Sequence, residues 1–257
     1  MEKTVLITGA TGTIGRAITK SLAEMGYNIV FTARSVDKAK LLVAEIKLKK
    51  VPSKLSYFIC DLGEKEQVIE LASKVDVPIN VLINNAAVTP RERMVTSAGI
   101  EMQWAVNVLG YHWMMKYFLP HLKKVENGRI VNVASYWAGH LDLSDPEFKK
   151  RVYDNNTAYM QSKQANRMLS KFYSDQLKSI TVNSCHPGDA NSKLSNDLGF
   201  GGHETPEQAA ATPVFLAMSD EVNNSTGDYF QNKKKTICRF SQDKEGVVKL
   251  YELCEQY

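Results

Sequence analysis

Cysteine is scarce in this chain, and its four cysteines follow no metal-binding or redox pattern. They are Cys60, Cys185, Cys238 and Cys254, none in a CxxC pair and none at ligand spacing from a histidine. This spacing argues against a disulfide framework and gives no metal site. We expect reduced structural thiols in a reducing compartment.

Long apolar runs and a strong excess of one charge are also missing. No stretch reaches the about eighteen apolar residues of a membrane span, and the start of the chain leaves no room for a signal peptide before its first strand. The formal net charge is +4, and the lysine run at 233–235 reads as a solvated loop rather than a nucleic-acid surface. These absences predict a cytoplasmic protein without a membrane span or a nucleic-acid partner.

Short apolar strands alternate with helical patterns along the whole chain. The strands are expected at 4–7, 28–33, 55–60, 80–83, 129–135, 180–185 and 227–230, and helices at 36–49, 64–74, 97–123 and 205–218. This alternation predicts an α/β fold, a Rossmann-type doubly wound parallel sheet with helices on both faces. Because the 257 residues contain neither a linker nor a repeat, we expect a single domain over 1–257.

A glycine-rich turn separates the first strand from a helical pattern. It runs from Gly9 to Gly15, and the helical spacing after it ends at Gly26. Strand, glycine turn and helix together aim backbone N–H groups and a helix N-terminus at a phosphate. A tight turn without a ligand is the alternative, and the flanking strand and helix favour the phosphate.

The end of the second strand indicates which dinucleotide would bind. A carboxylate that would bond the ribose 2′-hydroxyl of NAD is missing there, and Arg34 stands in that region. A guanidinium suits a 2′-phosphate, with Arg16 or Lys38 as a second cation. The sequence therefore predicts NADP(H), with NAD(H) as the less favoured cofactor.

Tyr159 and Lys163 are the candidate proton-transfer pair. Residues four apart share a helix face, and a nearby ammonium would lower the pKa of a phenol from about 10. Ser135 ends a strand, where its hydroxyl can donate to a carbonyl oxygen, and Asn107 is an unusual residue inside a long predicted helix. Each of these signals is weak alone.

Two segments are expected at the surface. The polar stretch 139–156 reads as an insertion, and the Gly-, Ser- and Asn-rich stretch 189–203 reads as a loop that forms a mobile lid over substrate. Aromatic side chains either line an apolar substrate site or belong to the core; these are Trp104, Trp113, Tyr136, Trp137 and Phe200.

These motifs stand in the order seen in the short-chain dehydrogenase/reductase family, which the chain resembles over essentially its whole length. The motifs are the Gly9 turn, Asp61, Asn84-Asn85-Ala86, Asn107, Ser135, Tyr159 with Lys163, and Pro187-Gly188 followed by Ser192. The segments 158–166 and 225–230 further resemble the retinol dehydrogenase-like branch, which includes WW-domain oxidoreductases. Homodimers are common in this family, through the helices that hold Asn107 and Tyr159, and the 139–156 insertion is placed to cover that surface.

The resemblance implies a role for each matching residue. Tyr159 would be the general acid/base, Lys163 would lower its pKa and hold the nicotinamide ribose, Ser135 would orient the substrate oxygen, and Asn107 would support a proton-relaying water. The implied cofactor-binding residues are Gly9, Thr11, Gly12, Thr13, Ile14, Gly15, Arg34, Asp61, Leu62, Asn84, Asn85, Ala86, Tyr159, Lys163, Pro187, Gly188 and Ser192.

Three positions depart from the family pattern. The glycines follow the Gly-x-x-Gly-x-x-Gly spacing of the extended branch, with Thr13 at the usual middle glycine, and Ala87 replaces a glycine after Ala86. Asp189 follows Pro187-Gly188, where an apolar residue is commoner, and would make the substrate mouth more polar.

The expected function is an NADP(H)-dependent oxidoreductase that acts on a small carbonyl or alcohol substrate, with a lipid-like or aromatic compound among the options. A non-catalytic dinucleotide sensor is one alternative, but it has no chemical reason to keep the whole catalytic set. An epimerase or dehydratase of the extended type is another, and the chain is short for that branch.

Overall fold

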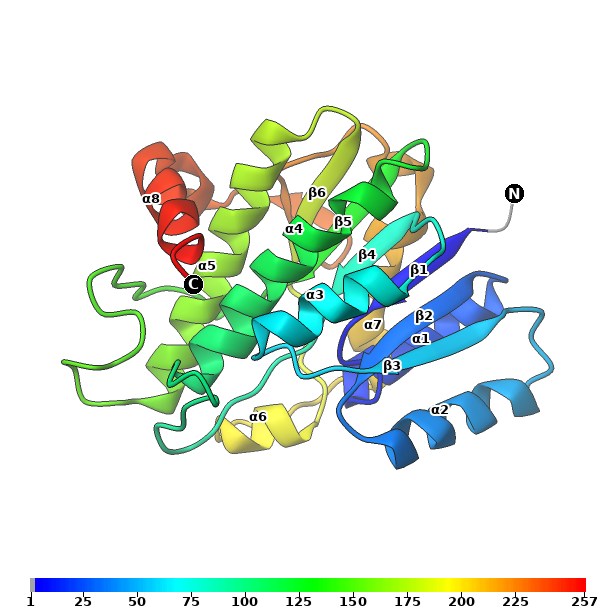
Figure 1. The fold of residues 1–257 in the computed structure, drawn as a ribbon, viewed down its shortest axis with the longest axis horizontal. Coiled ribbons are helices and arrows are strands. Elements are labelled where there is room, and N and C mark those ends of the chain that lie inside the picture. The colour runs from blue at the N-terminus through cyan, green and yellow to red at the C-terminus, as the bar shows by residue number, and fades with distance from the viewer. Residues whose placement is uncertain (1–2) are drawn as a thin grey trace.

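The computed structural model describes residues 3–257, and every strand in that part belongs to one sheet. The order of this 8-stranded sheet is β3-β2-β1-β4-β5-β6-β7-β8, parallel up to β7 and antiparallel between β7 and β8. The bounds are β1 Thr4–Ile7, β2 Asn28–Ala33, β3 Leu55–Ile59, β4 Val81–Asn84, β5 Gly128–Val133, β6 Ile180–Cys185, β7 Tyr229–Gln231 and β8 Lys234–Thr236. The predicted α/β class with a doubly wound sheet is confirmed (Figure 1).

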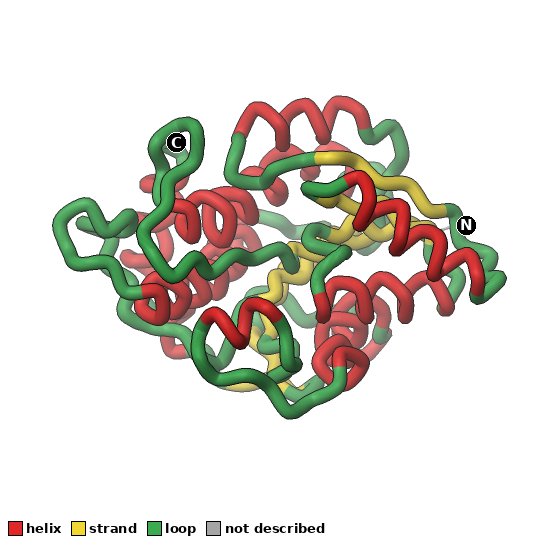
Figure 2. The backbone as a smooth tube through the Cα atoms, turned by 90° about the horizontal axis from the view of Figure 1, so that it is seen from below, coloured by secondary structure: helices red, strands yellow, loops and turns green. Residues whose placement is uncertain are grey.

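Helices cover both faces of the sheet, so its central strands are apolar on both sides. The α-helices are α1 Thr13–Glu24, α2 Val36–Leu48, α3 Lys65–Lys74, α4 Gly110–Leu122, α5 Asn155–Gln176, α6 Lys193–Asp197, α7 Pro206–Met218 and α8 Lys244–Cys254. In β1, Leu6 packs into one apolar cluster, while Val5 and Ile7 pack into another on the opposite face. Figure 2 shows the strands enclosed between these helical layers.

The long helix expected over 97–123 is not one regular helix. Residues Trp104–Leu109 form a π-helical segment, and the regular helix α4 begins only at Gly110. A Cβ added to Gly110 would lie 2.9 Å from the carbonyl oxygen of Leu62, so the backbone passes very close to the segment after β3. Helical spacing alone does not reveal this change of winding, because apolar residues continue on both sides of it.

The stretch 189–203, expected to be a loop, contains the short helix α6. Ser192 caps this helix in a reciprocal capping box with Ser195. The two ends of this stretch are held together, because the backbone N–H groups of His203 and Glu204 donate to the carbonyl oxygen of Asp189 at 2.8 and 3.0 Å. The glycine- and serine-rich composition concealed a helix of only five residues.

The C-terminal segment covers the outer side of α5. Helix α8 packs against α5, with the rings of Phe172 and Tyr251 stacked at 3.8 Å between centroids (Figure 1). The hydroxyl of Tyr257 donates to Glu147 of the 139–156 insertion at 2.8 Å. Both segments therefore lie by the helix that the family resemblance assigns to a dimer surface.

The lysine run at 233–235, expected to be a solvated loop, enters the sheet. Lys234 and Lys235 lie in β8, the exposed edge strand, and Lys235 pairs with Asp228 at 2.7 Å. Within 3–257, no helix combines the length and the apolar composition needed to cross a bilayer.

Candidate active site

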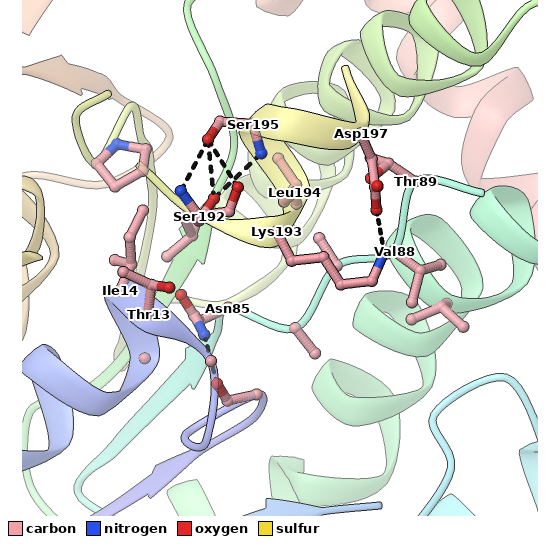
Figure 3. Close-up of a pocket in the computed structure, with 18 of the residues that line it drawn as sticks. Thr13, Ile14, Asn85, Val88, Thr89, Ser192, Lys193, Leu194, Ser195 and Asp197 are labelled. Carbon is pink, nitrogen blue, oxygen red and sulfur yellow. Dashed lines mark hydrogen bonds and ion pairs between the residues drawn. The ribbon is translucent and has the colours of Figure 1, made fainter. Parts of the chain in front are cut away.

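A cavity of about 720 Å³ lies at the carboxyl ends of the parallel strands. It is lined by nearly all of the predicted site residues, namely Gly9, Thr11, Gly12, Thr13, Ile14, Gly15, Arg34, Asp61, Leu62, Asn85, Ala86, Ser135, Tyr159, Lys163, Pro187, Gly188 and Ser192. Figure 3 shows the α6 segment along one side of this cavity, with Thr13, Ile14 and Asn85 across from it. The fold thus brings together residues as far apart in the sequence as Gly9 and Ser192.

The glycine turn forms one end of the cavity. Gly9 has φ +66°, and a Cβ on Gly15 would lie 2.1 Å from the carbonyl oxygen of Gly9, so both positions need glycine. The Asn85 amide donates to the carbonyl oxygens of Thr8 and Gly9 at 3.0 and 3.2 Å and fixes the turn. No side chain caps the start of α1 at Gly12, which leaves the helix N-terminus open to an anion.

The predicted cations differ in their availability. Arg34 and Lys38 are exposed and line the cavity where β2 ends. Arg16 instead binds Glu45 of α2, with Nε donating to Oε2 at 2.8 Å, and Lys20 holds the same carboxylate at 2.9 Å. These hydrogen bonds hold the pKa of Glu45 below its ordinary value. Arg34 and Lys38 are therefore the pair suited to a phosphate, and Arg16 is not.

Tyr159 and Lys163 lie on one face of α5 at the other end of the cavity. The Lys163 ammonium is 5.5 Å from the centroid of the Tyr159 ring, and it donates to the carbonyl oxygen of Val133 at 3.0 Å. Both side chains are buried. The helical i, i+4 spacing thus places both groups at the same site.

Lys163 was expected to lower the pKa of Tyr159, but in the folded protein the pKa of this phenol is raised. Burial raises the pKa of Tyr159 to about 12, against a smaller opposite effect of its hydrogen bond with Ser135. Burial lowers the pKa of Lys163 to about 7. The reason is that the ammonium is directed at the Val133 carbonyl oxygen, while both groups lose their hydration.

Ser135 follows β5 and is held from two sides. Its hydroxyl accepts a hydrogen bond from the N–H of Trp137 at 3.1 Å, and its carbonyl oxygen accepts one from the Arg167 guanidinium. Arg167 lies over the ring of Tyr229 at 3.6 Å. The sequence interpretation missed Arg167, although its position four residues after Lys163 puts it on the same helix face.

Asn84 and Asn107 do not line the cavity. The Asn84 amide donates to Asn132 at 2.9 Å, inside the sheet, and the expected contact of Asn84 with a ribose stays a prediction. The Asn107 amide oxygen accepts from the N–H of Val88 at 2.9 Å, and its NH2 group donates to the Val88 carbonyl at 3.0 Å. Asn107 therefore fixes the backbone of a residue that lines the cavity, rather than facing Lys163 itself.

Phe200 lines the cavity at the end that holds Tyr159, and two further rings contact residues of the lining there. The Trp137 ring lies 6.1 Å from that of Tyr159 and 5.6 Å from that of Phe200, and Tyr136 packs edge-on against His186 at 4.6 Å. Trp104 and Trp113, grouped with these rings at the sequence level, are core residues instead; they are 1% and 2% exposed.

Metal-ligand chemistry has no support in the described part of the chain. No group of three or more His, Cys, Asp or Glu side chains between residues 3 and 257 is arranged to hold a metal ion. The four cysteines are unpaired and buried. What this site offers is an open helix N-terminus, two cations and a buried tyrosine, serine and lysine.

We expect the α6 segment to move when the cavity is filled. Gly199 and Gly201 adopt φ +85° and +63°, and the helix before these glycines has only five residues. Hydrogen exchange of the backbone amides at 191–202 should slow on addition of NADPH, while those of α8 should not change. Equal exchange at 191–202 with and without NADPH would contradict the lid.

Comparison with known proteins gives consistent matches. The family described as short chain dehydrogenase matches residues 3–199. Retinol dehydrogenase 13 of Mus musculus is 31% identical over 272 residues, covering 97% of this chain and 81% of the relative. Polyprenol dehydrogenase of Homo sapiens is 27% identical over 259 residues, covering 91% and 78%. A short chain dehydrogenase of Burkholderia cenocepacia J2315, solved in complex with NADP, shares the fold with a TM-score of 0.71 and 23% identity, covering 89% and 95%.

Proposed function

The chain belongs to the short chain dehydrogenase family, in its retinol dehydrogenase-like branch, and from this premise we propose that it transfers a hydride between NADP(H) and a carbonyl or alcohol substrate. The proposal rests on which residues line a single cavity. The open helix start and the Arg34 cation lie at one end, and Ser135, Tyr159 and Lys163 lie at the other. The proposal needs both ends, since the cofactor must span them to reach the substrate.

The residues present fit a phosphorylated dinucleotide. The turn from Gly9 to Gly15 brings backbone close to the start of α1, where a pyrophosphate would be bound by N–H groups. Arg34 and Lys38 would hold the 2′-phosphate, and NADP is also the ligand named for the Burkholderia cenocepacia protein. The bound nicotinamide would supply or accept the hydride.

The side chains of this chain would control the substrate oxygen and its proton. The hydroxyl of Ser135, fixed by the Trp137 N–H, would orient the oxygen. Tyr159 would give its phenolic proton to that oxygen during reduction, and the pKa of about 12 keeps the phenol protonated near neutrality. Lys163 would then stabilise the phenolate with its ammonium.

Neither alternative function is favoured by the site. A dinucleotide sensor needs only the cofactor end, yet the tyrosine, serine and lysine converge on the same cavity. The extended-type glycine spacing is the only feature that suggested an epimerase or dehydratase, and the curated relatives named above are dehydrogenases.

Arg34→Ala should weaken NADPH binding by about 10- to 100-fold, because a charge-assisted, bidentate phosphate contact contributes roughly 1.5–3 kcal/mol. NADH affinity should change by less than about threefold, since NADH carries no 2′-phosphate. Nicotinamide fluorescence titrations of both proteins with both cofactors measure this.

Arg16→Ala is the matched control, because it removes a guanidinium that is bound to Glu45. It should leave NADPH affinity near that of the wild type. An equal loss of NADPH affinity in both variants would refute the specific role of Arg34. Failure of the wild type to bind either cofactor would overturn the proposed function as a whole.

A further inference from the structure

A carboxylate without a cationic partner faces the substrate end of the cavity. Asp189 lines the cavity directly after Gly188, and its side chain is 22% exposed. The basic side chain beside it is His186, whose Nε2 lies 3.7 Å from Oδ1 of Asp189. Within residues 3–257, no lysine or arginine forms an ion pair with Asp189.

Its partners do not supply a full positive charge near neutral pH. Burial lowers the pKa of His186 below its ordinary value, so this imidazole is predominantly neutral at pH 7. Tyr136 hydrogen bonds with the Asp189 carboxylate, and burial together with that negative charge raises the pKa of the phenol, which therefore stays neutral too. The negative charge at the mouth is uncompensated.

The acidic side chains that line this cavity differ in their partners. Asp197 forms an ion pair with Lys193, which Figure 3 shows at the far end of α6. Asp61 accepts the N–H of Gly63 at 2.9 Å. Asp197 is thus neutralised by a lysine, whereas neither Asp61 nor Asp189 forms an ion pair with a described lysine or arginine. Of these two, Asp189 is the one whose charge acts on Tyr159.

The exposed ring of Tyr136 lies beside this carboxylate, and Phe200 lines the same cavity. Tyr136 is 53% exposed and Phe200 is 46% exposed, and Trp137 connects Phe200 with the reactive tyrosine through ring contacts of 5.6 and 6.1 Å. The faces of such rings attract cations, most strongly where the cation has lost its hydration. Asp189 and Phe200 line the cavity that holds Tyr159, and the rings of Tyr136 and Trp137 contact residues of that lining.

We propose that this mouth selects a carbonyl or alcohol substrate that carries a positively charged amino group, bound between Asp189 and the rings of Tyr136, Trp137 and Phe200. The inference rests on the proposed function and names its substrate class. A neutral substrate that closed over Asp189 would remove water from the carboxylate without replacing its interactions, which is costly. A cationic group replaces that water with an ion pair and with cation–π contacts.

The negative charge of Asp189 would affect the proton transfer by Tyr159 as well as the choice of substrate. The negative charge of Asp189 adds to the burial that disfavours the Tyr159 phenolate. A substrate cation placed beside Asp189 would offset this charge at the moment when the phenolate forms. A neutral lipid-like substrate, of the kind that the names of the retinol and polyprenol dehydrogenases indicate for those proteins, would leave it uncompensated.

The test uses two ketones of nearly identical shape, 4-(trimethylammoniomethyl)acetophenone and 4-neopentylacetophenone. They differ by a permanent charge, so their ratio of kcat/KM isolates charge recognition from size. With NADPH, the wild type should prefer the cationic ketone by about 10-fold or more. Asp189→Asn should reduce the ratio to about 1–2, mainly through a higher KM for the cation. Asp175→Asn, which removes an exposed carboxylate of α5 that does not line the cavity, should keep the wild-type ratio.

A binding measurement makes the result independent of turnover. Titration with benzyltrimethylammonium should quench tryptophan fluorescence of the wild type at Trp137, with affinity weakened about 10-fold in Asp189→Asn. Equal ratios and equal affinities in both proteins would overturn the cation site while leaving the hydride-transfer function intact. If cation binding depends on Asp189 but neither ketone is reduced, the cation site stands and the proposed reaction on such carbonyls falls.

Discussion

Tyr159→Phe is expected to lower kcat by about 10²- to 10⁴-fold, the usual contribution of a positioned general acid or base. The change removes only the phenolic oxygen, so no group remains that can give a proton to the substrate oxygen from this position. The ring itself should stay in place, because it packs beside Trp137 and the Lys163 ammonium. Steady-state reduction of a ketone at saturating NADPH, with kcat and KM determined separately, measures the effect.

The control is Tyr57→Phe, which removes a hydroxyl from a ring of β3 that packs on Phe31 and does not line the cavity. This variant should keep kcat within about twofold of the wild type. The role of Tyr159 is disproved if Tyr159→Phe retains more than about a tenth of the wild-type kcat while its thermal unfolding is unchanged.

Lys163→Met should inactivate the enzyme and stabilise the fold at the same time. Loss of the ammonium should lower kcat/KM by about 10²- to 10³-fold, comparable to removing a donor that stabilises a developing oxyanion. Methionine fills a similar volume without a buried charge, and the carbonyl oxygen of Val133 keeps the Tyr111 hydroxyl as a donor at 3.2 Å. We therefore expect the free energy of unfolding to rise by about 1–3 kcal/mol at pH 6–7.

The pH dependence identifies the cause of this stabilisation. The pKa of Lys163 falls from 10.5 to about 7 on folding, so between these pH values the unfolded chain binds more protons than the folded protein. The free energy of unfolding of the wild type then rises with pH relative to the methionine variant. The advantage of the variant should be fully present below pH 7 and shrink toward pH 10.5.

Urea unfolding of both proteins without cofactor, at pH 6.5 and pH 9.5, measures this difference. Lys171→Met is the matched control on the same helix, because Lys171 pairs with the exposed Asp175 and should change stability by less than about 0.5 kcal/mol. A Lys163→Met protein that is less stable than the wild type at pH 6.5 would show that the ammonium stabilises the fold, contrary to this view.

Local patterns were sufficient to predict the framework of the site. Strands β1 and β2 have the predicted bounds, because short β-branched runs between turn residues have no competing helical period. Tyr159 and Lys163 share a face because helix geometry fixes residues four apart. The NADP(H) preference and the assigned roles of the site residues stay predictions until they are measured.

Contacts between elements that lie far apart along the chain could not be predicted from the sequence. Asn84 faces Asn132 because β4 and β5 pair in that register, which no local pattern specifies. The pairing of Arg16 with Glu45 likewise depends on how α1 lies against α2. The direction of the Lys163 ammonium depends on where the carbonyl of Val133 ends β5, and the sign of the Tyr159 pKa shift depends mainly on how the folded chain buries the phenol.

The lysines of β8 also determine how this sheet meets other proteins. An edge strand presents unpaired N–H and C=O groups, which invite a strand of another copy to extend the sheet into an aggregate. Here Lys234 and Lys235 stand exposed on that edge, Lys235 in its ion pair with Asp228, so two such edges would bring the Lys234 ammonium groups together. The antiparallel strand β8 thus lets an otherwise parallel sheet end in a strand that resists aggregation. This edge lies on the same side of the sheet as β6, the strand whose following loop carries Asp189.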